Sequence, residues 1–204
     1  MQHSSASAAN CDQKVRMRVI AGKFRSRPLR SLRGAEIRPT SDRLRETLFN
    51  VLCAGNPAVL EGSVWLDLFA GTGAVGIEAL SRGATMVYFV EKSKTAVELI
   101  AKNLEPFGVG DEFEILRQDV RRAISTLELR QLKPDFIFLD PPYAMDEAYT
   151  ETLGALAGSA ISEKALVVAE HEKKFDAGVE FGLLHRTRRL EQGDAALSFY
   201  RRAL

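Results

Sequence analysis

The stretch that decides the fold reads Val64-Trp65-Leu66-Asp67-Leu68-Phe69-Ala70-Gly71-Thr72-Gly73-Ala74-Val75-Gly76. Its first residues are apolar around a single acid, Asp67, which predicts a buried strand, and the glycines predict a tight turn into a helix near Ala74. A strand that runs through Gly-x-Gly-x-x-Gly into a helix is typical of nucleotide-binding sites, because glycine lets the backbone approach a ligand and the helix N-terminus offers free N–H groups. The same turn also occurs without a ligand. Asp67 favours a ligand, since a carboxylate at the end of a buried strand needs a cationic or hydroxyl-bearing partner.

Length and composition limit the possible classes of protein. The chain of 204 residues is long enough for one domain with an appendage, and 46% apolar residues are sufficient for a core. No apolar run approaches the length that crosses a bilayer, so we expect no membrane partner, and we expect residues 1–15 to form a disordered tail without a signal peptide. Two cysteines, Cys11 and Cys53, make neither a disulfide framework nor a metal site, and the simplest setting is a reducing cytoplasm.

Positive charge is concentrated near the N-terminus, although the formal net charge is only +1. Between Lys14 and Arg45 the chain has eleven Lys and Arg residues against two acids, so this segment carries +9 and the rest of the chain −8. A polyanion would relieve such self-repulsion, and we therefore expect this segment to contact nucleic acid.

Alternating strands and helices are predicted for most of the chain. The N-terminal segment reads as a hairpin of two short strands, residues 17–22 and 27–29, and a helix over 43–52 follows. The later strands are expected over residues 64–69, 86–91, 113–117, 136–140 and 165–170, with helices over 75–81, 95–104, 120–129 and 147–156 between them. Two final apolar stretches, 181–185 and 196–200, are expected to close the sheet as an antiparallel pair. We predict an α/β fold with a seven-stranded, mostly parallel, doubly wound Rossmann-like sheet and an N-terminal β-hairpin extension.

Acidic residues lie at the ends of several predicted strands, where doubly wound sheets bind their ligands. Asp67 and Asp140 are on the first and fourth of these strands, and Glu91 ends the second, 18 residues after Gly73. An acid at that position can accept hydrogen bonds from both ribose hydroxyls. Asp119 could receive an adenine amino group. Both NAD and S-adenosylmethionine fit these features.

The motif Asp140-Pro141-Pro142-Tyr143 separates the two cofactors. Proline cannot donate to a strand ladder, so the chain turns and exposes the Asp140 side chain and the Pro141 carbonyl. Two neighbouring acceptors match the two donors of an exocyclic NH₂ group, and Tyr143 offers a ring for stacking on a base. The motif predicts methyl transfer to the amine of a nucleobase, with Asp140, Pro141, Pro142 and Tyr143 as catalytic residues.

These motifs together resemble those of S-adenosylmethionine-dependent amino methyltransferases. Three further stretches are similar to the bacterial small-subunit ribosomal RNA guanine-N2 methyltransferase family: Arg18-Val19-Ile20-Ala21-Gly22, Arg38-Pro39-Thr40-Ser41-Asp42-Arg43-Leu44-Arg45-Glu46-Thr47-Leu48-Phe49-Asn50 and Gly76-Ile77-Glu78-Ala79-Leu80-Ser81-Arg82-Gly83-Ala84. The resemblance runs from about Arg16 to Ala144 and more faintly to Arg201.

The resemblance implies a class I methyltransferase that transfers a methyl group from S-adenosylmethionine to N2 of one guanine of 16S ribosomal RNA. The substrate would be the 30S subunit or an assembly intermediate. Apart from the resemblance, we expect the protein to be monomeric and cytoplasmic. Residues 16–57 would contact RNA and residues 58–204 would form the catalytic domain. The cofactor-binding residues would be Asp67, Phe69, Ala70, Gly71, Thr72, Gly73, Glu91, Lys92, Asp119, Val120, Asp140 and Thr40. The RNA-binding residues would be Arg18, Lys23, Arg25, Arg27, Arg38 and Arg43.

Some features leave other interpretations open. Glu170-His171-Glu172 is only loosely similar to the family's acidic end of the fifth strand, and we expect His171 on the surface rather than as a general base. A DNA adenine-N6 methyltransferase would carry the same Asp-Pro-Pro-Tyr motif, although 204 residues leave no room for a separate base-recognition domain. A non-catalytic RNA-binding assembly factor would not need the acids and glycines together. A nicotinamide dehydrogenase would leave Asp-Pro-Pro-Tyr unexplained.

Overall fold

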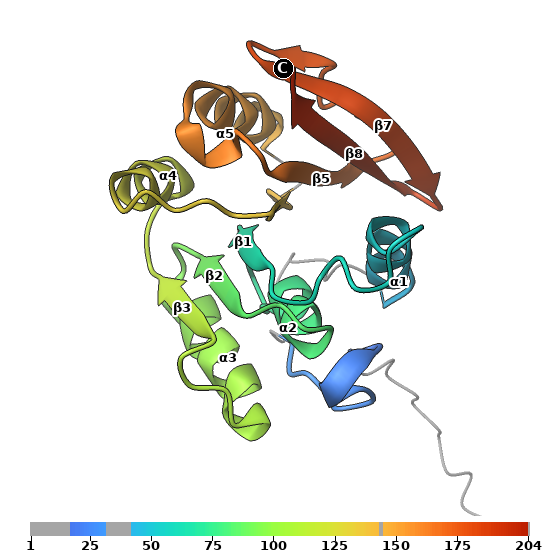
Figure 1. Cartoon of the computed structure of the whole chain (residues 1–204), viewed down its shortest axis with the longest axis vertical. Coiled ribbons are helices and arrows are strands. Elements are labelled where there is room, and N and C mark those ends of the chain that lie inside the picture. The colour runs from blue at the N-terminus through green and yellow to red at the C-terminus, as the bar shows by residue number, and fades with distance from the viewer. Residues whose placement is uncertain (1–16, 32–41, 143–144, 204) are drawn as a thin grey trace, which may run out of the picture.

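The computed structural model describes residues 17–31, 42–142 and 145–203. An eight-stranded sheet lies at its centre, with strand order β3-β2-β1-β4-β5-β8-β7-β6 (Figure 1). The predicted tail, residues 1–15, and the predicted site residues Arg38, Thr40 and Tyr143 lie outside the described residues. Of the helices within the described ranges, none has the length and apolar character that crossing a bilayer requires.

Parallel pairing joins the first five strands and confirms the predicted doubly wound sheet. These strands are β1 (Val64–Leu68), β2 (Met86–Val90), β3 (Phe113–Leu116), β4 (Phe136–Leu139) and β5 (Leu166–Glu172). Every residue of β4 is buried, because helices cover the sheet on both faces and its strands must be apolar on both sides. The chain moves outward from β1 to β3, then returns to the other side of β1 as β4. The switch point between β1 and β4 is where such sheets bind ligands.

The antiparallel end of the sheet differs in detail from the prediction. β8 (Ala195–Arg202) pairs with β5 and with β7 (Leu184–Gln192), as expected of a closing antiparallel pair. The predicted count of seven strands is wrong by one, because β6 (Glu180–Phe181) adds a two-residue strand beside β7. A strand of two residues is too short to show the alternation of apolar and polar residues by which a strand is predicted. The predicted strand 181–185 is wrong, because it spans the end of β6, the turn at 182–183 and only the start of β7. Most of β7 was missed, since its charged residues lie largely on exposed positions and give no apolar pattern.

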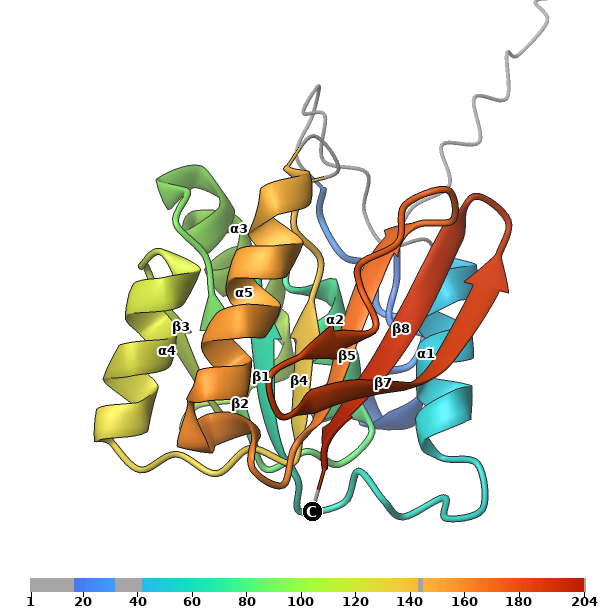
Figure 2. The ribbon, with the colours of Figure 1, turned by 90° about the horizontal axis from the view of Figure 1, so that it is seen from above.

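Helices cover the two faces of the sheet in separate groups (Figures 1 and 2). One face carries α1 (Asp42–Leu52), α2 (Ala74–Ser81) and α3 (Lys94–Leu104), and the other carries α4 (Val120–Leu129) and α5 (Asp146–Gly158). Short 3₁₀ turns lie at Gly22–Phe24, Glu105–Phe107 and Ala160–Ser162. Each face has its own apolar cluster, and the one under α1 contains Trp65, which stacks on Phe49 and Phe136 at ring-centroid distances of 5.4 and 5.0 Å.

The basic N-terminal segment folds back on itself and docks on α2. The predicted hairpin is present as one antiparallel bridge between Arg18 and Pro28 rather than as two regular strands. The buried Glu78 side chain accepts hydrogen bonds from the Ile20 and Ala21 amides at 2.7 and 3.0 Å. Gly22 has a φ of +78°, and a Cβ atom there would overlap a backbone oxygen of α2. This close approach requires glycine and fixes the segment against the helix that follows the glycine turn.

Candidate active site

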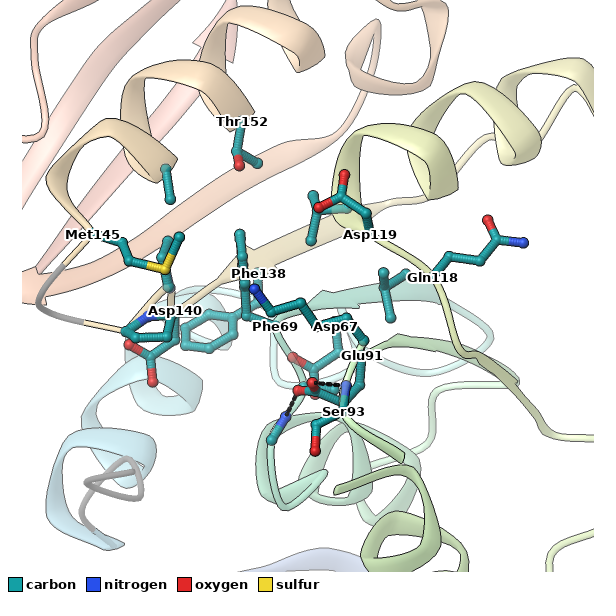
Figure 3. Close-up of a pocket in the computed structure, with 18 of the residues that line it drawn as sticks. Asp67, Phe69, Glu91, Ser93, Gln118, Asp119, Phe138, Asp140, Met145 and Thr152 are labelled. Carbon is teal, nitrogen blue, oxygen red and sulfur yellow. Dashed lines mark hydrogen bonds between the residues drawn. The ribbon is translucent and has the colours of Figure 1, made fainter. Parts of the chain in front are cut away.

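A pocket of about 480 Å³ opens at the carboxyl ends of β1 to β4, at the switch point of the sheet (Figure 3). Its size suits a ligand of nucleotide dimensions. Most of the predicted cofactor-binding and catalytic residues line this pocket: Asp67, Phe69, Ala70, Gly71, Thr72, Glu91, Lys92, Asp119, Val120, Asp140, Pro141 and Pro142.

The glycines of the turn have different roles. Gly71 lines the pocket, whereas Gly73, predicted to bind the cofactor, does not line it among the described residues. Gly73 adopts a left-handed φ of 76° where α2 begins, and a Cβ atom there would lie 3.2 Å from Ile100. It therefore serves the turn and the packing of α2 against α3. Phe69 also has a left-handed φ, 60°, which is rare for a bulky residue and occurs mainly at functional sites.

Asp67 is 2% exposed and has one backbone partner in the first turn of α2. Its Oδ2 accepts a hydrogen bond from the Gly76 amide at 2.9 Å. Burial raises the pKa of this carboxyl to about 8, the Gly76 hydrogen bond opposes the rise, and the negative charge of Glu91 adds to it. A cation in the pocket would favour the charged form of Asp67, so the residue suits a positively charged ligand.

Glu91 fastens the glycine turn to the end of β2. Its Oε2 accepts a hydrogen bond from the Gly71 amide at 3.0 Å, and its Oε1 accepts one from the Ser93 amide at 2.8 Å (Figure 3). A carboxylate oxygen can accept more than one hydrogen bond, so the predicted contact with ribose hydroxyls is compatible with this arrangement. Asp119 caps α4 by accepting from the Arg121 amide at 3.0 Å, and its predicted contact with adenine stays a prediction.

The Asp-Pro-Pro turn lies at the opposite end of the pocket from Asp119 (Figure 3). Asp140 directly follows β4 and is half-buried, Pro141 is buried, and Pro142 is exposed. The Pro142 carbonyl accepts a hydrogen bond from the Met145 amide at 2.9 Å, which closes the turn before α5. The pocket thus has one end lined by Asp67, Glu91 and Asp119 and a second end lined by Asp140, Pro141 and Pro142.

Several lining residues were not predicted. They are Ala74, Val75, Val90, Ser93, Gln118, Arg121, Phe138, Met145, Ala148, Glu151 and Thr152. Met145, Ala148 and Thr152 are spaced by three and four residues along the start of α5, so helical periodicity applied after the Asp-Pro-Pro motif could have found them. Ser93 and Gln118 follow the ends of β2 and β3 and carry no pattern of their own.

The predicted RNA-binding residues that the structure describes are all exposed, but they differ in their ion pairs. Arg25, Arg27 and Arg43 are exposed, and no salt bridge joins them to another described residue. Lys23 forms an ion pair with Glu112 at 3.0 Å, and Arg18 lies 3.9 Å from Asp42. Exposed pairs of this kind contribute little and leave the cations able to contact phosphate.

The expectation that His171 lies on the surface is wrong. His171 is fully buried on β5, where its Nδ1 lies 2.8 Å from the Glu172 carbonyl and its Nε2 lies 2.9 Å from the Ser198 hydroxyl of β8. Desolvation by burial lowers the pKa of this imidazole and favours the neutral form. Its partner is distant in sequence, so the local motif could not reveal the burial.

Residues 17–201 match the model of a family described as Conserved hypothetical protein 95. The chain belongs to this family. It is 37% identical over 163 residues to Ribosomal RNA small subunit methyltransferase D of Haemophilus influenzae, covering 78% of this chain and 81% of that protein. It is 33% identical over 188 residues to YlbH of Bacillus subtilis, covering 91% of this chain and 99% of that protein.

Solved structures of the same fold agree with this membership. A hypothetical protein from Thermus thermophilus superimposes with a TM-score of 0.76 at 30% identity, covering 91% of this chain and 99% of that chain. The predicted family resemblance and the Rossmann-like methyltransferase fold are therefore confirmed. The names of the methyltransferase relatives support the predicted cofactor, S-adenosylmethionine, and the acidic lining of the pocket fits its positive charge.

Proposed function

We propose that this protein transfers a methyl group from S-adenosylmethionine to the exocyclic N2 of a specific guanine in 16S ribosomal RNA, within the 30S subunit or an assembly intermediate. The observation that carries the proposal is the placement of Asp140 and Pro141 at one end of the cofactor pocket, where two acceptors can meet one amine. The relative from Haemophilus influenzae is named a ribosomal RNA small subunit methyltransferase, which supports this class of substrate.

Bound S-adenosylmethionine supplies an electrophilic methyl group on a sulfonium centre. An aryl amine is a poor nucleophile, because its lone pair is delocalised into the ring. The task of the protein is therefore to orient the amine. The Asp140 carboxylate and the Pro141 carbonyl would each accept one N–H hydrogen, which favours a pyramidal nitrogen with its lone pair directed at the methyl group. The carboxylate also stabilises the positive charge that develops on nitrogen, and it can take the released proton.

The basic segment would hold the RNA. The exposed Arg25, Arg27 and Arg43 can pair with phosphates, which provide affinity and register without reading sequence. Because Glu78 fixes the segment to α2, phosphates bound there are held in a defined position relative to the pocket. The target base must leave its stack to reach Asp140. We assign RNA contact to residues 16–57 and catalysis to residues 58–204. We propose that the protein acts as a monomer.

Replacement of Asp140 tests the acceptor role. Asp140→Ala should reduce methyl transfer to 30S subunits by about 100-fold or more, because a charged transition-state contact is lost. Binding of S-adenosylmethionine, measured by calorimetry, should change by less than about threefold if Asp140 acts mainly on the amine.

Asp146→Ala is the matched control, since Asp146 is an exposed acid at the start of α5 and does not line the pocket in the described structure. It should keep both activity and binding. Equal loss of binding and turnover in Asp140→Ala would show that Asp140 only binds cofactor and would contradict the proposed role.

A further inference from the structure

The parallel strands β4 and β5 separate where the pocket begins. Their register runs from Phe136 opposite Leu166 to Leu139 opposite Ala169 and then stops. The residues that would continue the β4 side include Pro141 and Pro142, and neither has an N–H group to donate toward β5. The two prolines therefore leave β5 without the backbone donors that would continue the ladder on the β4 side.

A side chain from α5 lies at this point of separation. The Tyr149 hydroxyl donates a hydrogen bond to the Glu170 carbonyl of β5 at 2.9 Å and also lies in donor geometry 3.4 Å from the Pro141 carbonyl. A phenol has one hydrogen, so the two carbonyls share it unequally. The hydroxyl thus takes the place of the backbone donor that the prolines lack.

The ring of Tyr149 is held by packing rather than by this hydrogen bond. The side chain is 1% exposed, and its ring lies 5.0 Å from the ring of Phe175 and edge-on to His171 at 6.3 Å. Among the described residues Pro141 lines the pocket and Tyr149 does not. The Pro141 carbonyl is therefore a pocket-lining group that the Tyr149 hydroxyl contacts.

We propose that Tyr149 is a positioning residue, whose hydroxyl fixes the direction of the Pro141 carbonyl so that it can accept an N–H of the target amine. This inference rests on the proposed function, in which that carbonyl and Asp140 orient the amine together. A carbonyl has two acceptor sites, so a shared hydrogen from Tyr149 leaves one free for the substrate. Loss of the hydroxyl would free the turn and misdirect the amine without touching the cofactor end of the pocket.

The experiment compares Tyr149→Phe with Tyr200→Phe. Tyr200 is also fully buried, and its hydroxyl likewise donates to a backbone carbonyl, that of Gly178 at 2.8 Å, but it does not line the pocket in the described part of the chain. Both variants keep the ring and remove one buried hydroxyl, so both should lower the thermal midpoint by similar amounts. The readouts are the single-turnover rate on 30S subunits with tritiated S-adenosylmethionine, and cofactor affinity by calorimetry.

Tyr149→Phe should lower the single-turnover rate by about tenfold or more at saturating RNA, because small errors in alignment are costly. Its cofactor affinity should stay within about twofold of the wild type, and Tyr200→Phe should keep the wild-type rate. A wild-type rate in Tyr149→Phe, or equal rate losses in both variants, would overturn the positioning role.

An inactive wild type would count against the proposed function rather than against the role of Tyr149. In that case crystal structures of the two variants decide the inference. A Pro141 carbonyl that is displaced in Tyr149→Phe alone supports it, and an unmoved carbonyl overturns it.

Discussion

Cofactor binding at pH 7 is expected to release a proton from Asp67. With a pKa of about 8, about nine-tenths of these carboxyls are protonated in the free protein at pH 7. A cationic ligand beside the carboxyl favours its ionised form and lowers that pKa, so binding should release close to one proton per cofactor at pH 7 and about 0.1 at pH 9. As the pH rises toward 8, the association constant should increase by up to about tenfold per pH unit, and it should level off above pH 8.

Calorimetry in buffers of different ionisation enthalpy measures this release directly. The amino group of the cofactor also titrates, so the quantity of interest is the difference between the wild type and Asp67→Asn, in which the carboxyl is absent. The wild type should release the additional proton and Asp67→Asn should not. Equal proton release by the two proteins at pH 7 would refute the account of Asp67.

Stability of the free protein provides an independent check on the same pKa. Because folding raises the pKa of Asp67 from 3.8 to about 8, its stabilising contribution is complete below pH 4 and is lost as the pH rises through 8. The shift corresponds to at most about 6 kcal/mol, at about 1.4 kcal/mol per pKa unit. As the pH rises from 4 to 8, the free energy of unfolding of the wild type should therefore fall relative to that of Asp67→Asn. Parallel curves for the two proteins would contradict the shifted pKa.

Three further predictions follow from other contacts. Glu91→Gln should weaken cofactor binding by about tenfold, because an amide has only one acceptor oxygen for the two backbone N–H groups that the carboxylate now holds; unchanged affinity in calorimetry would contradict this. Arg25→Ala with Arg27→Ala should weaken RNA binding and flatten its salt dependence by about two units of slope, with cofactor affinity unchanged, and an unaltered salt slope would show that these arginines do not contact phosphate. Gly22→Ala should lower stability by about 2–4 kcal/mol, because its Cβ would meet the backbone of α2, whereas Gly110→Ala, with open space around it, should not; equal melting temperatures would contradict the close approach.

The sequence was informative where a local pattern determines the structure. The apolar strands, the glycine turn and the acids at the strand ends are local features, and a doubly wound sheet brings the ends of its parallel strands to one edge. The positions of Asp67, Glu91 and Asp140 around one pocket follow from that rule alone. Their partners could not be predicted, because the backbone amide that Asp67 contacts depends on how α2 packs.

Contacts between residues far apart in the chain could not be predicted from the sequence. Glu78 reads as an ordinary helix acid, yet it is fully buried and holds the N-terminal segment 57 and 58 residues away. His171 and Tyr149 owe their burial to β8 and to the β4–β5 junction, which no local pattern describes. These polar residues are buried because tertiary structure supplies their hydrogen-bond partners.

The proposed methyl transfer to guanine N2 is tested most directly with tritiated S-adenosylmethionine and three substrates, 30S subunits, naked 16S RNA and duplex DNA, followed by nucleoside analysis. We expect label in the ribosomal samples as N2-methylguanosine and none in DNA. Label in DNA as N6-methyladenine would indicate a DNA methyltransferase instead. Absence of transfer to every substrate, with cofactor binding intact, would contradict the proposed methyltransferase activity and favour a non-catalytic role in assembly.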